Sequence, residues 1–232
     1  MNKAILSKIE TRRYAGTRIK TLVTCTLRVF FLILLGSIPA CTPTLPPEQG
    51  ILNAFATTAA APWLAGLYTC AAASNVTIKI SAESPQIILR IGEPSALIHP
   101  AYQIGSEEIL MVTQNDNPLA QLTPDQVRTL FTQGNPSGQV WVYASDSDIQ
   151  MVFDQLVLNG QNPTSRARVA VSPHEMSAKL QADTAAIGIL PRSSLPSNLR
   201  VLASAGSVPV LALTQKEPAG VIVDLITCLQ DK

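Results

Sequence analysis

The sequence contains few of the residues on which metal sites, redox centres and nucleophilic enzymes depend. Among its 232 residues there are four cysteines and two histidines. No cysteines are spaced as Cys-x-x-Cys, and His99 and His174 have no companions at metal-ligand spacing. Gly-x-Ser-x-Gly and phosphate-cradling Gly-Lys loops are also missing. We therefore expect no metal, no cofactor and no enzyme activity. A hydrolase using Ser145 or Ser147 is the weakest alternative, because the sequence shows no base to activate either hydroxyl.

Charged residues are also scarce, at 14% of the sequence, and they are unevenly distributed. Seven of the 17 basic residues, but only one of the 16 acidic ones, lie in residues 1–28. The chain after residue 40 therefore has 10 basic and 15 acidic residues and a formal charge of about −5. It has no basic stripe interleaved with aromatic residues. We expect an acidic module that does not bind nucleic acid.

The first 40 residues have the features of an export signal. A basic head precedes an apolar run at 29–38, which is too short for a permanent membrane helix. The run closes on Ile-Pro-Ala-Cys, ending at Cys41, which resembles the lipobox of bacterial lipoproteins. That resemblance implies that 1–40 is a signal peptide and that lipid on Cys41 anchors the chain to an extracytoplasmic membrane surface. A soluble secreted protein cut near Ala40 is the alternative. Residues 41–49 are rich in Pro and Thr and are interpreted as a tether.

Cys70 and Cys228 are the cysteines that remain beyond Cys41. In exported proteins such a pair more often forms a disulfide than two free thiols. Both cysteines lie in segments with a helical pattern, near opposite ends of the mature sequence. We predict a Cys70–Cys228 disulfide, which closes a loop of about 158 residues and requires the first and last helices to pack together.

The mature sequence opens with a β-α-β pattern. Strands are predicted at 51–56 and 76–80, on either side of a helix at 59–73. This order is typical of a parallel sheet. Further strands are predicted at 87–91, 104–113, 168–171, 185–190, 199–202 and 208–214, and further helices at 124–131, 172–182 and after Pro218.

Residues 139–158 are the most informative stretch. Gln-Val-Trp-Val-Tyr-Ala predicts a buried strand, and the polar turn 145–148 leads at once into a helix with one apolar face, which stops at Asn159-Gly160. Ser145 with Asp148 fits a helix cap. A strand that enters a helix through a polar turn is also where α/β proteins bind small ligands.

Three segments, in chain order, resemble the substrate-binding proteins of ABC importers with the type II periplasmic-binding-protein fold, in particular the phosphate-binding branch. They are Asn-Pro-Leu-Ala-Gln-Leu-Thr-Pro-Asp-Gln-Val-Arg-Thr-Leu-Phe-Thr-Gln-Gly at 117–134, Ala-Ala-Ile-Gly-Ile-Leu-Pro at 185–191 and Gln-Lys-Glu-Pro-Ala-Gly at 215–220. The resemblance implies an α/β fold of two lobes, with mixed sheets and helices on both faces. Lobe I would comprise 50–102 plus 192–232, and lobe II 103–191.

The resemblance also places a ligand in the cleft between the lobes, at turns that begin helices. The matching residues are Thr57, Thr58, Ser145, Asp146 and Ser147. Phosphate binders have Arg-x-x-Gly-Ser-Gly-Thr at the second turn, whereas here Asp146 and Asp148 replace the glycines and the arginine is absent. Two carboxylates would repel a dianion. A neutral, cationic or protonated ligand, or none, fits better than phosphate.

The sequence thus supports two functional hypotheses. The first is a lipid-anchored extracytoplasmic solute-binding protein that closes over a small ligand, with oxyanions among the candidates, and delivers it to an ABC permease. The second is a surface interaction or sensor module with the same fold and a degenerate ligand site. Trp63 and Trp141 are interpreted as residues of the core or of the interface between lobes. Arg90 is expected to extend its charged end to solvent from the end of its strand or to pair with a nearby acid such as Glu93, rather than with a ligand.

Overall fold

The computed structural model describes residues 50–232, which fall within one compact unit. The predicted signal peptide (1–40), the tether (41–49) and the lipidation site Cys41 lie outside the described residues. Between residues 50 and 232, none of the helices combines the length and hydrophobicity that a bilayer crossing requires.

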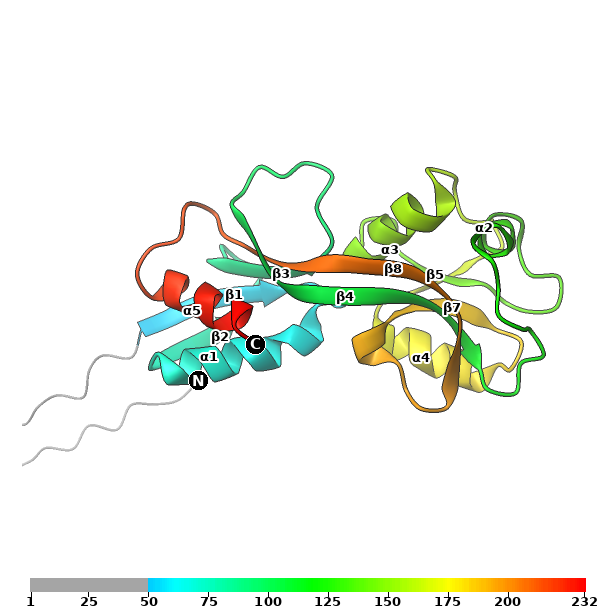
Figure 1. Ribbon diagram of the computed structural model, residues 1–232, viewed down its shortest axis with the longest axis horizontal. Coiled ribbons are helices and arrows are strands. Elements are labelled where there is room, and N and C mark those ends of the chain that lie inside the picture. Colours follow the sequence, from blue (N-terminus) through cyan, green and yellow to red (C-terminus); the bar gives the residue numbers. More distant parts are fainter. Residues whose placement is uncertain (1–49) are drawn as a thin grey trace, which may run out of the picture. The chain divides into compact units, whose positions relative to one another are not determined.

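A mixed sheet of six strands, in the order β2-β1-β3-β8-β4-β7, runs through the described chain (Figure 1). β1 pairs in parallel with β2 and β3, whereas β8 is antiparallel to both β3 and β4. The parallel pairing of β1 and β2 confirms the predicted β-α-β opening. The strand bounds are β1 Gly50–Ala56, β2 Val76–Ile80, β3 Ile87–Ile91, β4 Ala101–Gln114, β7 Ile187–Pro191 and β8 Leu199–Leu213.

A second, two-stranded sheet pairs β5 (Trp141–Tyr143) in parallel with β6 (Arg168–Ala170). A parallel bridge between Val140 and Ile187 connects it to β7. In Figure 1 helix α4 lies on one side of this region, and α2 and α3 lie on the other. The helices are α2 Pro124–Gln133, α3 Asp148–Phe153 with its π-helical continuation η2 Asp154–Leu158, and α4 Pro173–Ala182. We use "lobe II" for these elements with β7, and "lobe I" for β1–β3 with α1 and α5.

The strands β4 and β8 pair along almost their whole length and belong to both lobes. The sequence predicted two separate strands at 199–202 and 208–214; this was wrong, because β8 is continuous from Leu199 to Leu213. Gly206, at a φ of +106°, and shifts in the pairing register at Ile109/Leu110 and Met111/Val112 let the paired backbone pass through the polar interval without a break. Since both strands cross between the lobes, the lobe bounds stay a prediction.

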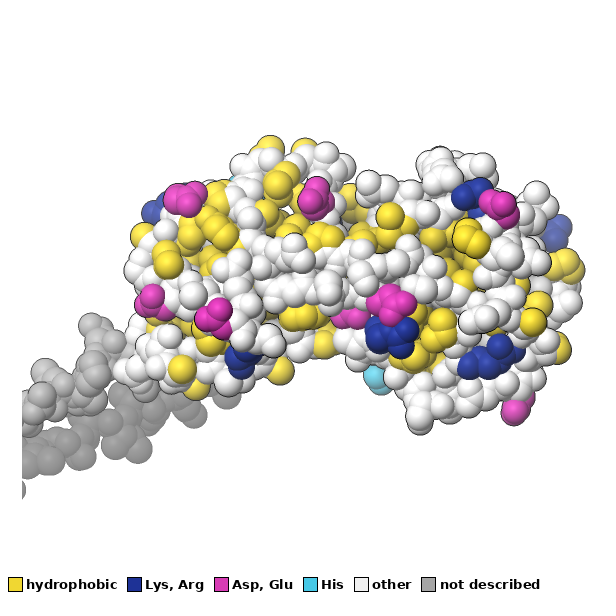
Figure 2. All heavy atoms as spheres, viewed as in Figure 1, with side chains coloured by type: hydrophobic (Ala, Val, Ile, Leu, Met, Phe, Trp, Pro, Cys, Tyr) yellow, Lys and Arg dark blue, Asp and Glu magenta, His cyan; other side chains and the backbone are white. Residues whose placement is uncertain are grey.

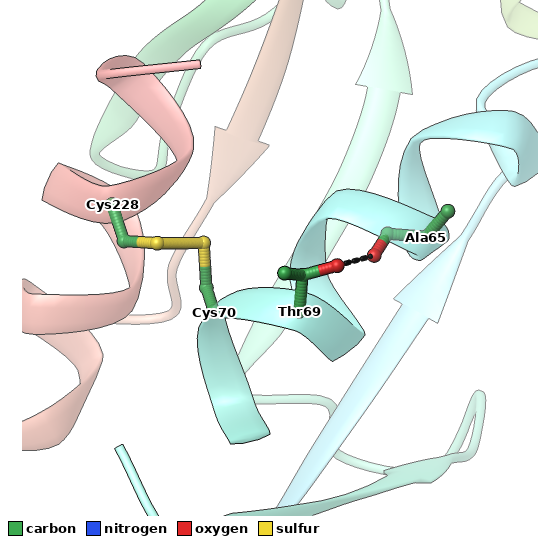
Figure 3. Close-up of a disulfide and its surroundings, with 4 residues drawn as sticks. All are labelled: Ala65, Thr69, Cys70 and Cys228. Carbon is green, nitrogen blue, oxygen red and sulfur yellow. Dashed lines mark hydrogen bonds between the residues drawn. A yellow bond between two sulfur atoms is a disulfide. The ribbon is translucent and has the colours of Figure 1, made fainter. Parts of the chain in front are cut away.

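Helix α1 (Leu64–Ala73) and the last helix α5 (Val221–Gln230) lie side by side and are joined by a disulfide (Figure 3). The Cα atoms of Cys70 and Cys228 are 5.9 Å apart, within the ordinary range for a bridge. The predicted disulfide is therefore confirmed. The helix expected at 59–73 begins later, since its first turn, η1 (Ala61–Trp63), is a 3₁₀ helix with Pro62 near its start.

Aromatic residues fill the core of lobe II. The rings of Phe131 on α2 and Phe153 on α3 are 4.7 Å apart, and both side chains are fully buried. Trp141 is 8% exposed, and the cations of Arg168 and Lys179 lie 5.9 and 5.6 Å from its ring centroid. Trp141 therefore packs at the edge of this core, as the sequence predicted. The arrangement of a mixed sheet with helices confirms the α/β class.

Candidate functional site

Two of the predicted ligand turns meet between the lobes at the side chain of Asp148. Thr57, at the end of β1, donates its hydroxyl to Asp148 Oδ2 at 2.5 Å, and the backbone N–H of Ile91 donates to the same oxygen at 2.9 Å. The N–H of Ile149 donates to Oδ1 at 2.9 Å. The carboxylate of lobe II is thus held by a hydroxyl and an amide of lobe I as well as by its own helix.

The lobe I side of the contact is fixed by the backbone. The N–H of Thr57 donates to the carbonyl of Leu89 on β3 at 3.0 Å, and the N–H of Ala60 donates to the carbonyl of Thr57 at 3.1 Å. The Thr57 hydroxyl oxygen also accepts from the Ala60 N–H at 3.3 Å. The Thr57 hydroxyl therefore accepts a hydrogen bond from its own turn and donates its proton to the neighbouring lobe.

The lobe II side is a capped helix start. Ser147 is the N-cap of α3, with its hydroxyl accepting from the Gln150 N–H at 3.3 Å. The prediction that Ser145 is the cap was wrong: the helix begins two residues later, where the Ser147 backbone is extended and its N–H donates to the Ala144 carbonyl at 3.0 Å. The buried Gln150 accepts from the Tyr143 N–H at 2.8 Å and so connects the helix to β5.

Burial makes the Asp148 contact electrostatically strong. The Asp148 residue is 4% exposed, so its charge is poorly screened by water. Burial lowers the pKa of the nearby Arg90 guanidinium, and the negative charge of Asp148 acts in the opposite direction. Burial, and then the same carboxylate, raise the pKa of Tyr143. Arg90 Nε donates to the Gly92 carbonyl at 3.0 Å, rather than to Glu93 as predicted.

A close apolar contact adjoins the polar one. Gly92 follows β3 with a φ of +70°, and a Cβ built on it would lie 2.3 Å from Val152 Cγ2 on α3. A larger residue here would require the Val152 side chain to shift, and the positive φ also favours glycine. The lobes therefore meet at Asp148 and at Val152, which are four residues apart on one helix face.

A second buried carboxylate lies where β4 crosses between the lobes. Glu107 is 4% exposed and accepts from Trp63 Nε1 at 3.3 Å and from the Ser193 N–H at 3.1 Å. The Trp63 ring packs directly on Gly105, where a Cβ would lie 2.3 Å from Cη2. Trp63 thus occupies a position at the crossing strands, in agreement with a packing role.

The predicted site residues do not share one environment. Thr57 and Ser147 are half-buried at the contact, whereas Thr58, Ser145 and Asp146 are exposed. The sequence predicted a capping role for Asp148 and a repulsive role toward anions, but not its contact with the Thr57 turn. Its position four residues before the apolar Val152 was the available signal that Asp148 faces inward.

Within residues 50–232, no group of three or more His, Cys, Asp or Glu residues is placed to hold a metal ion.

A groove lies next to this contact, between the loop after β3 and the helix α3–η2. It has a volume of about 740 Å³ and two carboxylates in its wall. Burial raises the pKa of one of them, Asp154, while the hydrogen bond from Gln150 acts in the opposite direction. The lining residues are Glu93, Pro94, Ser95, Met151, Asp154, Gln155, Asn159 and Gly160.

Solved structures share this fold at low sequence identity. A putative phosphate ABC transporter substrate-binding protein with bound phosphate, from Clostridium perfringens, has a TM-score of 0.68 and 16% identity, covering 78% of this chain and 93% of that one. An ABC-type phosphate transport receptor from Vibrio cholerae has a TM-score of 0.57 and 14% identity, covering 78% of this chain and 93% of that one. The reduced regulatory domain of OxyR2 from Vibrio vulnificus has a TM-score of 0.62 and 12% identity, covering 81% of this chain and 97% of that one.

Full-length CbnR in complex with its target DNA is also similar, with a TM-score of 0.57 and 14% identity over 80% of this chain and 70% of that chain. No protein family and no curated protein sequence matches the chain. The structural neighbours show the fold, which is that of a type II periplasmic-binding-protein-like module. Both transport receptors and regulatory domains are built on it.

Proposed function

We propose that this chain is an exported, lipid-anchored solute-binding protein whose two lobes close over a small ligand and deliver it to an ABC permease. The observation that supports this function best is the meeting of the Thr57 turn with the start of α3 between the lobes. Hinge closure of two lobes on crossing strands brings such turns together around a ligand. The likeness to two phosphate-transport receptors supports the same function.

The charges around the site favour a neutral or cationic ligand with hydrogen-bond donors over phosphate. Asp148 lies at the contact itself, and Glu93 and Asp154 line the groove beside it. Carboxylates accept hydrogen bonds and repel anions, most strongly where water is excluded. We therefore expect amines, cationic amino acids and polyols to bind in preference to inorganic phosphate.

Thermal shift of the mature chain against amines, amino acids, sugars, oxyanions and metal ions tests this proposal. A specific ligand at a hundredfold excess over its Kd stabilises by about 2.7 kcal/mol. Thr57→Val should weaken binding of that ligand by roughly threefold to tenfold, the worth of one hydrogen bond, whereas the exposed Thr58→Val should not. Lack of a shift with every compound would contradict solute delivery.

The second candidate function is a surface interaction or sensor module. It is favoured by the Asp148 side chain itself, which already fills the space between the Thr57 hydroxyl and the Ile91 amide. The presence of OxyR2 regulatory domains among the neighbours agrees with such a role. This candidate predicts no response to the solute panel, and capture of the folded chain by a protein partner instead.

The membrane anchor has its own test. Metabolic labelling with a fatty acid should mark the wild-type chain, and Cys41→Ser should abolish the label and release the protein from membranes. A wild-type chain that is cut near Ala40 and carries no label would contradict the anchor and leave a soluble exported protein.

Absence of nucleic-acid binding stays a prediction. On the face shown in Figure 2, basic side chains lie in separate groups, several of them beside acidic ones. Such a distribution does not form the continuous positive track that a phosphate backbone requires. The similarity to CbnR covers 70% of that chain, so a part of the DNA-bound protein lies outside the match.

A further inference from the structure

The Asp148 carboxylate is bound as a free anion would be. Its Oδ2 accepts from one hydroxyl and one backbone amide of lobe I, at 2.5 and 2.9 Å, and its Oδ1 accepts from Ile149. A carboxylate has only acceptors, and its charge makes the bonds it accepts from hydroxyl and amide donors stronger than bonds between neutral groups. The donors of lobe I thus form an oxyanion receptor.

We infer that Asp148 is a built-in ligand of this receptor, which holds the two lobes closed and excludes free oxyanions from the site. The inference concerns the same site as the proposed function, but it does not require that a solute be delivered. It assigns to Asp148 the role that an oxyanion would otherwise have, and it makes this residue the determinant of which ligands the site accepts.

Tethering gives Asp148 an advantage over any dissolved competitor. The side chain is attached to a capped helix that packs against Gly92, so its effective concentration at the Thr57 hydroxyl is far above that of a free anion. A competing anion would also be repelled by the displaced charge. Opening the lobes leaves the Ile91 N–H and the Asp148 carboxylate in need of new partners, so closure is favoured without a solute.

Removing the side chain should convert the site into a receptor for added anions. In the full mature chain, Asp148→Gly should lower the melting temperature relative to wild type. Formate, acetate or inorganic phosphate should then raise the melting temperature of the variant in a saturable way, compared with sodium chloride at equal ionic strength. The wild type should show no such response. Asp146→Gly removes an exposed carboxylate two residues earlier and should behave as wild type.

Equal anion responses in wild type and both variants would overturn the inference, as would an Asp148→Gly chain whose melting temperature is unchanged. If that variant does not fold, hydrogen exchange on the wild type tests the inference instead. The Ile91 amide should be protected from exchange without any added compound, and rapid exchange would refute the inference that Asp148 holds the lobes closed. Failure of the solute panel alone contradicts delivery and leaves this inference intact. Binding of phosphate by wild type supports delivery and refutes the inference.

Discussion

Removing the Cys70–Cys228 disulfide should destabilise the chain by roughly 2–5 kcal/mol, one of the two largest effects expected here. The bridge joins residues 158 positions apart, so its loss removes a constraint on most of the described chain in the unfolded state. It also releases α5 from α1, and α5 is the last element of the described chain to pack on lobe I. In a chain of this size we expect the melting temperature of Cys70→Ser with Cys228→Ser to fall by roughly 5–15 °C.

Calorimetry with and without reductant supplies the control. Reductant should bring wild type down to the melting temperature of the double variant, and it should leave the variant unchanged. A wild type that melts at the same temperature under both conditions would show that the bridge contributes nothing to stability. Peptide mapping without reductant should recover the two cysteines in one linked peptide.

Local patterns in the sequence were sufficient for most elements of the fold. The parallel opening followed from the order of strand and helix, and the helix predicted at 124–131 is α2, which the structure shows to start with a capping box of Thr123 and Gln126. Pairing of the cysteines was predicted from the expected export and from their positions in two segments with a helical pattern. Each of these features depends on residues close in sequence or on a covalent bond, which is why no knowledge of the packing was required.

Features set by distant contacts were less visible. The continuity of β8 depends on backbone pairing with β4, which compensates for the polar stretch around Gly206 and Ser207. The identity of the α3 cap depends on where β5 ends, two residues before the serine that the spacing favoured. The role of Asp148 depends on donors 91 and 57 residues away in the chain. None of these partners can be found from the spacing of residues 145–148.

Gly92→Ala should lower the free energy of unfolding by about 2–4 kcal/mol, the second large effect, because it combines backbone strain with overpacking. The glycine has a φ of +70°, and the new Cβ would lie 2.3 Å from Val152 Cγ2 on the opposite lobe. Urea unfolding would measure the loss. Gly160→Ala is the matched control, because Gly160 has a φ of +79° and open space around its Cβ position. Gly160→Ala should lose only the stability that corresponds to the backbone strain, about 1 kcal/mol.

The same substitution reports on closure of the lobes. If the clash is what destabilises Gly92→Ala, then Val152→Ala should relieve it, and the double variant should be more stable than the sum of the two single losses by about 1 kcal/mol or more. Faster hydrogen exchange at Ile91 in Gly92→Ala, reversed in the double variant, would show that the helix carrying Asp148 is pushed away from its donors. Strictly additive losses, with exchange at Ile91 unchanged, would mean that these two side chains do not meet in solution and that the lobes are held together elsewhere.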